Sequence, residues 1–473
     1  MWLNSSSVLD SRSVRMVIVA RFCMLRRIHV RTGGCRAIQF ALLSFFAAAL
    51  PAQRRTAKGP SGSGRAAANT DVLTAVAVVT IPSAVFHNNR EAYVWLPSGE
   101  SVSAERYPVL IFPDAEEKGQ FRAALANVQF LIDRQLIPPM MVVGVPYFAN
   151  RRHELTPVAT GATAQTYPAA GGADDNLRFI GEELLPWIDA RYPTVQTRIL
   201  VGHSLGGLFA LYSMVAKPDL FRVVVALSPP LTWNDGSLSA DVASRLATDK
   251  SRRRTLFLAS GGLEPSIDVP VTDFATRLTR LLDSLKTKNL SFERQRYPGD
   301  VHEMTPLPGL VDGLRMAFEP LVVPFDSVAH VLSQRQRPDS AEILGAAVAL
   351  ESRYDAAAAI LGVPGRFPEA PLDALGSYAL SSKFAGLAVT LLRENRDRYP
   401  ASSNAHESFG EALAAVGDST SAEHELRTAI AIAHDTLRTT RSIISRTRAR
   451  GVTAAATAQL RVMHRRAPDQ QRS

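Results

Sequence analysis

The feature that most constrains the fold of this chain is residues 198–207, an apolar run that ends in Gly-His-Ser-Leu-Gly with its serine at position 204. Small residues two positions before and after a serine let the backbone turn sharply from a strand into a helix. Such a turn lifts the Ser204 hydroxyl out of a sheet and leaves the Leu205 amide free at a helix N-terminus. We interpret this run as a nucleophile elbow, because residues 197–201 read as a buried strand and residues 205–216 as an apolar helix.

A serine nucleophile needs a base and an acid, and a fold with such an elbow supplies them in the chain order serine, acid, histidine. His302 is the candidate base, since it follows a strand predicted over residues 291–297 and precedes a helix that begins near Pro306. The acid is expected after the strand predicted over residues 255–259. Glu264 is nearer the end of that strand and is favoured, with Asp268 as the alternative, because either carboxylate can fix the imidazole tautomer.

Two backbone amides are the candidate donors of an oxyanion hole. The first is Leu205, directly after the serine. The second is Ala115, because it follows an early core strand predicted over residues 107–112. A pair of amides at these places can stabilise the negative charge that develops on a carbonyl oxygen under attack.

Strands and helices alternate through the central part of the chain. Apolar runs at residues 139–145 and 223–227 predict further buried strands, and residues 174–190 and 272–285 carry the apolar spacing of helices. This alternation predicts an α/β fold with a mostly parallel sheet and helices on both faces. Active residues are then expected at the carboxyl ends of the strands.

The region from about residue 71 to residue 322 also resembles a known family. It is similar to the putative esterases among the α/β-hydrolases, which include enterochelin esterases and mycolyltransferases. The resemblance implies an α/β-hydrolase fold with Ser204 as nucleophile, His302 as base and Glu264 as acid. The matching segments are residues 80–85, 93–97, 107–114, 137–144, 171–174, 179–186, 191–193, the elbow, 227–230 and 298–302.

One segment departs from the family pattern. The family usually has Arg-Thr-Arg-Asp-Leu-Thr-Pro here, whereas residues 151–157 read Arg-Arg-His-Glu-Leu-Thr-Pro, with His153 in place of the second arginine. In relatives this strip lies near the pocket, so the resemblance implies Arg151 as a substrate-binding residue, with a loop ion pair as the alternative. Trp233 resembles an aromatic residue that lines the pocket, and a buried packing role is its alternative.

The N-terminus has the pattern of an export signal. A basic stretch containing Arg26 and Arg27 precedes an uncharged segment, residues 37–50, and Ala52 is a small residue at the expected cleavage site. We therefore predict a signal peptide over residues 1–52, with Met24 as an alternative start, and a secreted or periplasmic protein. An uncleaved membrane anchor is the alternative, and it is the only route we expect to a membrane. A linker rich in Gly, Ser and Ala is expected over residues 53–70.

Both cysteines, Cys23 and Cys35, lie in this leader, so a mature chain without it has neither disulfides nor zinc thiolate sites. No group of residues has metal-ligand spacing, and we expect no metal and no cofactor. The formal net charge is +9, but residues 1–52 hold seven arginines and one aspartate, and residues 438–473 hold nine arginines and one aspartate. The segment between them therefore carries −5, which argues against nucleic-acid binding. Residues 438–473 read as a solvated arginine-rich tail.

The C-terminal part predicts an all-helical segment. An offset of 34 residues pairs Gly376 with Gly410 and Leu392 with Leu426, a period that resembles tetratricopeptide repeats. We assign this segment to residues 335–437, after an esterase domain over residues 71–325. A segment with so few repeats is not easily stable by itself, and we therefore expect it to dock on the hydrolase domain. It could also bind a protein partner.

These features together predict an exported serine hydrolase that cleaves small carboxylic esters of the siderophore, aryl or acyl-sugar type. An acyltransferase with the same triad is the first alternative, because only the second acceptor differs. A scaffold that has lost catalysis and binds partners through the helical segment is the second.

Overall fold

The computed structural model describes residues 76–97, 106–248, 253–264, 269–285, 289–323, 339–439 and 443–466, and all of them belong to one compact unit. The predicted leader and linker, the alternative acid Asp268 and the last seven residues lie outside the described residues. Among the described helices, none has the length and apolarity needed to span a bilayer.

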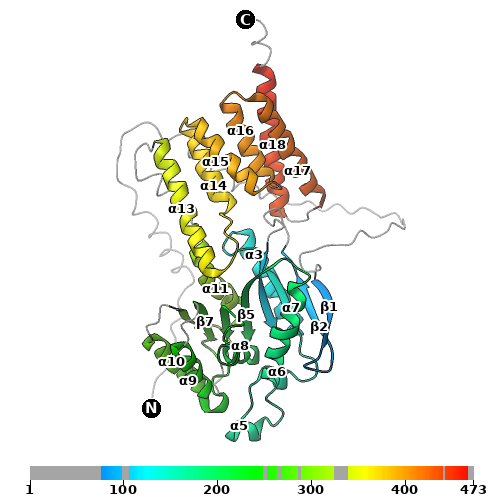
Figure 1. Ribbon diagram of the computed structural model, residues 1–473, viewed down its shortest axis with the longest axis vertical. Coiled ribbons are helices and arrows are strands. Elements are labelled where there is room, and N and C mark those ends of the chain that lie inside the picture. The colour runs from blue at the N-terminus through cyan, green and yellow to red at the C-terminus, as the bar shows by residue number, and fades with distance from the viewer. Residues whose placement is uncertain are drawn as a thin grey trace, which may run out of the picture. The chain divides into compact units, whose positions relative to one another are not determined.

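The hydrolase domain is built on one eight-stranded sheet with the order β1-β2-β4-β3-β5-β6-β7-β8. Figure 1 shows this sheet with helices packed around it. β2 runs antiparallel to both of its neighbours, β1 and β4, and the remaining neighbours pair in parallel. The mostly parallel sheet predicted from the sequence is therefore confirmed. The strands are β1 (Val76–Ser83), β2 (Asn88–Trp95), β3 (Tyr107–Pro113), β4 (Met141–Val145), β5 (Thr194–His203), β6 (Val223–Leu227), β7 (Arg254–Gly261) and β8 (Leu290–Tyr297).

Helices cover both faces of the sheet, because alternate strand residues feed two separate cores. Leu110 and Phe112 of β3 belong to a core with α3 (Lys118–Asp133) and α11 (Pro306–Phe318). Val109 and Ile111 point into the opposite core. That second core contains residues of α6 (Ala173–Arg178), η2 (Phe179–Leu184), α7 (Leu185–Asp189), α8 (Leu205–Ala216), α9 (Ser237–Thr248) and α10 (Val269–Ser284). Burial on both faces explains why the central strands read as continuous apolar runs.

Four short elements complete the hydrolase domain. These are α4 (Arg151–Leu155), α5 (Gly161–Thr166), η3 (Trp233–Gly236) and η5 (Glu319–Leu321). The single helix expected over residues 174–190 is divided into α6, the π-helical turn η2 and α7. Pro186 lies in the first turn of α7 and cannot donate to the carbonyl four residues earlier, which accompanies this change of hydrogen-bonding register.

Helices are the only regular elements among the described residues of the C-terminal region. Gly376 of α14 faces Leu392 of α15, and Gly410 of α16 faces Leu426 of α17 in the same way. A Cβ atom on Gly376 would lie 2.4 Å from Leu392, and one on Gly410 would lie 2.9 Å from Leu426. Only glycine therefore allows the helices to approach this closely at both places. The helices are α13 (Ser340–Leu361), α14 (Glu369–Ser381), α15 (Ala385–Arg398), α16 (Ser403–Ala415), α17 (Ser419–Thr439) and α18 (Ile443–Arg466).

Helix α18 occupies most of the segment that the sequence suggested was a solvated arginine-rich tail. Ala449, Val452 and Ala456 are buried at helical spacing, and the first two form a small core with Ala429 and Ala433 of α17. The helical region therefore extends beyond residue 437. The sequence did not indicate this helix, because it is rich in arginine and its apolar stripe is narrow and made mostly of alanine.

The helical region meets the hydrolase domain at the amino ends of the strands. The Thr197 hydroxyl, near the start of β5, bonds to the carbonyl oxygens of Leu361 and Gly362 at 2.8 and 2.7 Å. Arg222, directly before β6, donates to the carbonyl oxygen of Ile360. The core under α3 and α11 continues into α13 and α14. These contacts lie at the opposite ends of the strands from the elbow serine.

Candidate active site

The elbow has the strained backbone that a strand-to-helix turn requires. Ser204 has φ 57° and ψ −120°, and its amide donates to the Leu227 carbonyl oxygen at 2.9 Å. A Cβ atom on Gly202 would lie 2.1 Å from the Gly206 carbonyl oxygen, which no side chain tolerates. The nearest atoms to a Cβ on Gly206 are 3.6 Å away, so this glycine is not sterically required. The backbone strain of the turn is therefore at Ser204, whereas Gly202 is the position that has no room for a side chain.

The predicted acid and base lie together. His302 Nδ1 is 3.7 Å from Glu264 Oε2, and the side chains are 28% and 7% exposed. The other carboxylate oxygen of Glu264 accepts hydrogen bonds from the Ser228 hydroxyl and from the Gly261 amide at 2.6 Å. Burial raises the pKa of Glu264, but these bonds and the contact with His302 outweigh it, so the pKa lies below its usual value. The carboxylate is therefore ionised where it meets the imidazole.

Neighbouring strands bring these groups to one edge of the sheet. Ser204 follows β5, Glu264 follows β7 and His302 follows β8, and β5, β6, β7 and β8 are parallel neighbours. The imidazole rings of His203 and His302 lie 4.6 Å apart between centroids. The residue directly before the elbow serine thus contacts the predicted base, as expected at the carboxyl ends of a parallel sheet.

Ala115 follows a strained residue that is held by an ion pair. Asp114, at the end of β3, has φ 69°, and Ala115 is fully buried. The Arg151 Nε donates to both carboxylate oxygens of Asp114 at 2.7 Å, and a second guanidinium nitrogen also contacts that carboxylate. Burial lowers the pKa of Arg151, but the bonds and charge of Asp114 outweigh it and the pKa is raised. Arg151 therefore holds the backbone next to Ala115 and still exposes 32% of its side chain.

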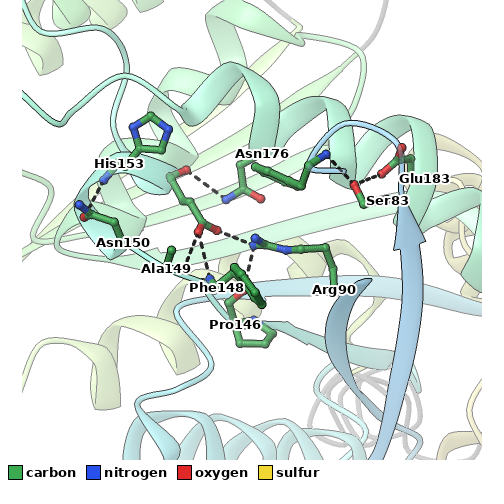
Figure 2. Close-up of polar contacts among 11 residues, drawn as sticks. Ser83, Arg90, Pro146, Phe148, Ala149, Asn150, His153, Asn176 and Glu183 are labelled. Atoms are coloured by element: carbon green, nitrogen blue, oxygen red, sulfur yellow. Dashed lines mark hydrogen bonds and ion pairs between the residues drawn. The ribbon is translucent and has the colours of Figure 1, made fainter. Parts of the chain in front are cut away.

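The strip that carries Arg151 is anchored by a buried ion pair (Figure 2). Arg90 on β2 pairs with Glu154 on α4, and the two side chains are only 3% and 5% exposed. The amides of Phe148 and Ala149 donate to the same Glu154 carboxylate at 3.0 and 3.2 Å. The Arg90 guanidinium also lies 4.2 Å from the centroid of the Phe86 ring. These contacts satisfy both buried charges and fix α4 beside the end of β4.

Trp233 is largely buried beside an aromatic neighbour. Its ring stacks on Tyr167 with centroids 5.6 Å apart, and only 5% of the residue is exposed. The Arg152 guanidinium lies 4.1 Å from the centroid of the Tyr167 ring. Asn234 ties η3 to the loop before α5, since its side chain accepts from the Thr160 amide at 2.9 Å. Trp233 therefore offers little surface to a ligand in this conformation.

Sequence reasoning did not identify several residues that hold the site. They are Asp114, Ser228, His203 and the pair Arg90–Glu154. Their partners are far away in the chain, so periodicity and spacing gave no signal. The signal available was position, because Asp114, Ser228 and His203 each lie at the end of a core strand. Among the described residues, no group of three or more His, Cys, Asp and Glu side chains is arranged to hold a metal ion.

Comparison with known sequences gives a consistent result. A family model described as "Putative esterase" matches residues 83–307. The chain is 30% identical over 231 residues to the ferri-bacillibactin esterase of Bacillus subtilis, which covers 45% of this chain and 80% of the relative. It is 35% identical over 114 residues to the siderophore enterobactin esterase of Emericella nidulans, covering 21% of this chain and 38% of the relative.

Solved structures share the fold. An IroE-like serine hydrolase from Shewanella oneidensis superposes with a TM-score of 0.55 at 24% identity, covering 68% of this chain and 99% of the other. An uncharacterised protein from Capnocytophaga ochracea superposes with a TM-score of 0.53 at 18% identity, covering 80% of this chain and 99% of the other.

Proposed function

Because the chain belongs to the putative esterase family and is a carboxylic ester hydrolase, we propose that it is an exported serine esterase acting on siderophore-type esters through Ser204, His302 and Glu264. One observation carries the catalytic part: the strained Ser204 follows β5, and the paired Glu264 and His302 follow β7 and β8 at the same edge of the sheet. An ionised carboxylate at Nδ1 favours the tautomer with its proton on that nitrogen, so that the other ring nitrogen of His302 can act as the base.

The proposed reaction has two half-reactions. In the first, His302 takes the Ser204 proton while Oγ forms a bond to the acyl carbon, and the carbonyl oxygen becomes an oxyanion near the amides of Leu205 and Ala115. The ester C–O bond then breaks, and His302 returns the proton to the departing alcohol. In the second, water attacks the acyl-enzyme with His302 again as base, which releases the acid and restores Ser204.

The proposed role of the Arg151–Asp114 pair is to support the oxyanion hole. A side chain that clamps Asp114 fixes the direction of the following amide, that of Ala115. The exposed part of Arg151 remains available for substrate, as the family resemblance implies. Trp233 is proposed to act indirectly, through its stacking on Tyr167.

The substrate class rests on the relatives. One relative is named a ferri-bacillibactin esterase, and another is named a siderophore enterobactin esterase. Aryl and acyl-sugar esters remain alternatives within the same chemistry. Transfer to an alcohol in place of water is the other enzymatic outcome, because the acyl-enzyme is common to both.

Export rests on residues 1–52, where a basic stretch is followed by an apolar core and a small residue. N-terminal sequencing of the mature protein from the extracytoplasmic fraction tests it. A start at Gln53 supports cleavage after Ala52, and a retained leader in the membrane fraction supports an anchor.

Hydrolysis assays test the enzymatic proposal. The wild type, Ser204→Ala and a control, Ser213→Ala in the helix that follows the elbow, are compared on enterobactin and on p-nitrophenyl esters of graded length. We expect activity in the wild type and the control and none above background in Ser204→Ala. Equal activity in all three would contradict the proposal. Added alcohols would reveal acyl transfer as a second product.

A further inference from the structure

We infer that His203 is a positioning residue that holds the base, His302, in place, an inference that rests on the proposed function. His203 is the residue before the elbow serine and is 9% exposed. Its Nε2 lies 2.9 Å from the His302 carbonyl oxygen, and its Nδ1 lies 3.3 Å from the Gln120 side-chain nitrogen. The contact therefore joins α3, the elbow and the loop after β8.

The partners of His203 determine its tautomer. A carbonyl oxygen only accepts, so Nε2 must carry the proton that bonds to His302. Nδ1 of the neutral ring then accepts from the Gln120 amide. Burial lowers the pKa of His203 to about 4, and the nearby charge of His302 adds to this effect. The ring consequently stays neutral near pH 7 and does not repel a protonated His302.

Hydrogen bonds help to hold the His203 ring in place, because packing leaves a cavity on one side of it. A cavity of about 140 Å³ adjoins His203 and Gln120, with Leu307 and Leu310 of α11 among its lining residues. The loop that carries His302 ends at α11, and three apolar side chains near it, Val301, Met304 and Leu307, are exposed. The His203 bond fixes the backbone of this loop at the base itself. A base held this way keeps a fixed position through both half-reactions.

Substitutions can separate positioning from simple structural support. His203→Phe keeps the ring volume but removes the donor to His302, whereas His203→Gln can place an amide N–H near the Nε2 position. We expect His203→Phe to lower kcat about tenfold or more with KM little changed, because a small displacement of a base is costly. His203→Gln should restore kcat to within about threefold of the wild type.

Gln120→Met provides a second variant that leaves the elbow intact. If Gln120 acts through His203, Gln120→Met lowers kcat by a smaller factor, and the double variant with His203→Phe is no slower than His203→Phe alone. Multiplicative losses in the double variant would overturn the inference. A fall in thermal stability with unchanged kcat in His203→Phe would also overturn it, because it would show a structural role only.

Labelling by a fluorophosphonate distinguishes failure of this inference from failure of the proposed function. If the wild type is not labelled, the serine hydrolase proposal fails. If the wild type is labelled and folded His203→Phe is labelled at the same rate, the proposal stands and the positioning role of His203 is overturned. We expect labelling of His203→Phe to be slower by the same factor as its kcat.

Discussion

Glu264 approaches His302 on the nitrogen that faces away from substrate chemistry in a serine triad, with Oε2 3.7 Å from Nδ1. The distance is longer than an ordinary hydrogen bond, whereas the same carboxylate is held firmly by Ser228 and Gly261. The carboxylate of the proposed acid is thus held by contacts that do not involve the proposed base. Such contacts commonly tighten when substrate binds.

This relationship predicts the effect of removing the charge on Glu264. Glu264→Gln should lower kcat by about 10² to 10⁴-fold, because the imidazole loses its fixed tautomer and the imidazolium loses its counter-charge. Asp268→Asn is the matched control and should retain activity near that of the wild type. The opposite pattern, with Asp268→Asn inactive and Glu264→Gln active, would assign the acid to Asp268.

The Arg151–Asp114 pair predicts a split between kinetic constants. Arg151→Gln should lower kcat about tenfold with a smaller change in KM, since the amide of Ala115 loses its fixed direction. Arg152→Gln, which removes the cation above Tyr167, serves as the neighbouring control. A rise in KM with unchanged kcat in Arg151→Gln would instead make this arginine a residue that only binds substrate.

Replacing the two elbow glycines by alanine should change the stability of the fold to very different extents. Gly202→Ala places a methyl group 2.1 Å from a backbone oxygen and should destabilise the fold by about 3 kcal/mol or more. Gly206→Ala meets only ordinary contacts and should remain folded with most of its activity. Urea denaturation of both variants measures the difference. Equal losses of stability would show that Gly206 is constrained as tightly as Gly202.

Glu116, next to Ala115, predicts a pH dependence of stability. Burial raises its pKa from 4.5 to about 7, and the charges of Asp114 and Glu154 add to the shift, although a bond from the Tyr147 backbone opposes it. The protonated form is favoured in the fold, so its stabilising contribution is present below pH 4.5 and is lost as pH rises through 7. Glu116→Gln should therefore match the wild type near pH 5 and unfold at a higher temperature near pH 8.5.

The exposed neighbour Glu117 provides the control for that measurement. Glu117→Gln should show the same pH dependence of Tm as the wild type. A difference between Glu116→Gln and the wild type that does not change with pH would contradict the account, because it would reflect packing and not titration.

Local features of the sequence were sufficient for the elbow and its helix. The helix predicted over residues 205–216 has those bounds in α8, since glycine spacing and apolar periodicity act within a few residues. The chain order of serine, acid and histidine then placed Glu264 and His302, and the structure brings these two together. The positions of strand ends in a parallel sheet follow from such local patterns.

Contacts between distant segments could not be predicted. Arg151 and Asp114 are 37 positions apart, and His203 and His302 are 99 apart, so no periodicity connects them. Trp233 stacks on Tyr167, which lies at the end of another element, α5. Helix α18 was missed for a different reason, because abundant arginine outweighed a stripe of small residues. Composition describes the average of a helix, whereas packing depends on one face.

The most direct test of the account is the site of covalent labelling by a fluorophosphonate, read by intact mass and peptide mapping. The account predicts one adduct per chain, on Ser204, absent from Ser204→Ala and strongly slowed in His302→Ala. A folded wild-type chain that forms no adduct, or forms it on another serine, would contradict the central claim that Ser204 is an activated nucleophile.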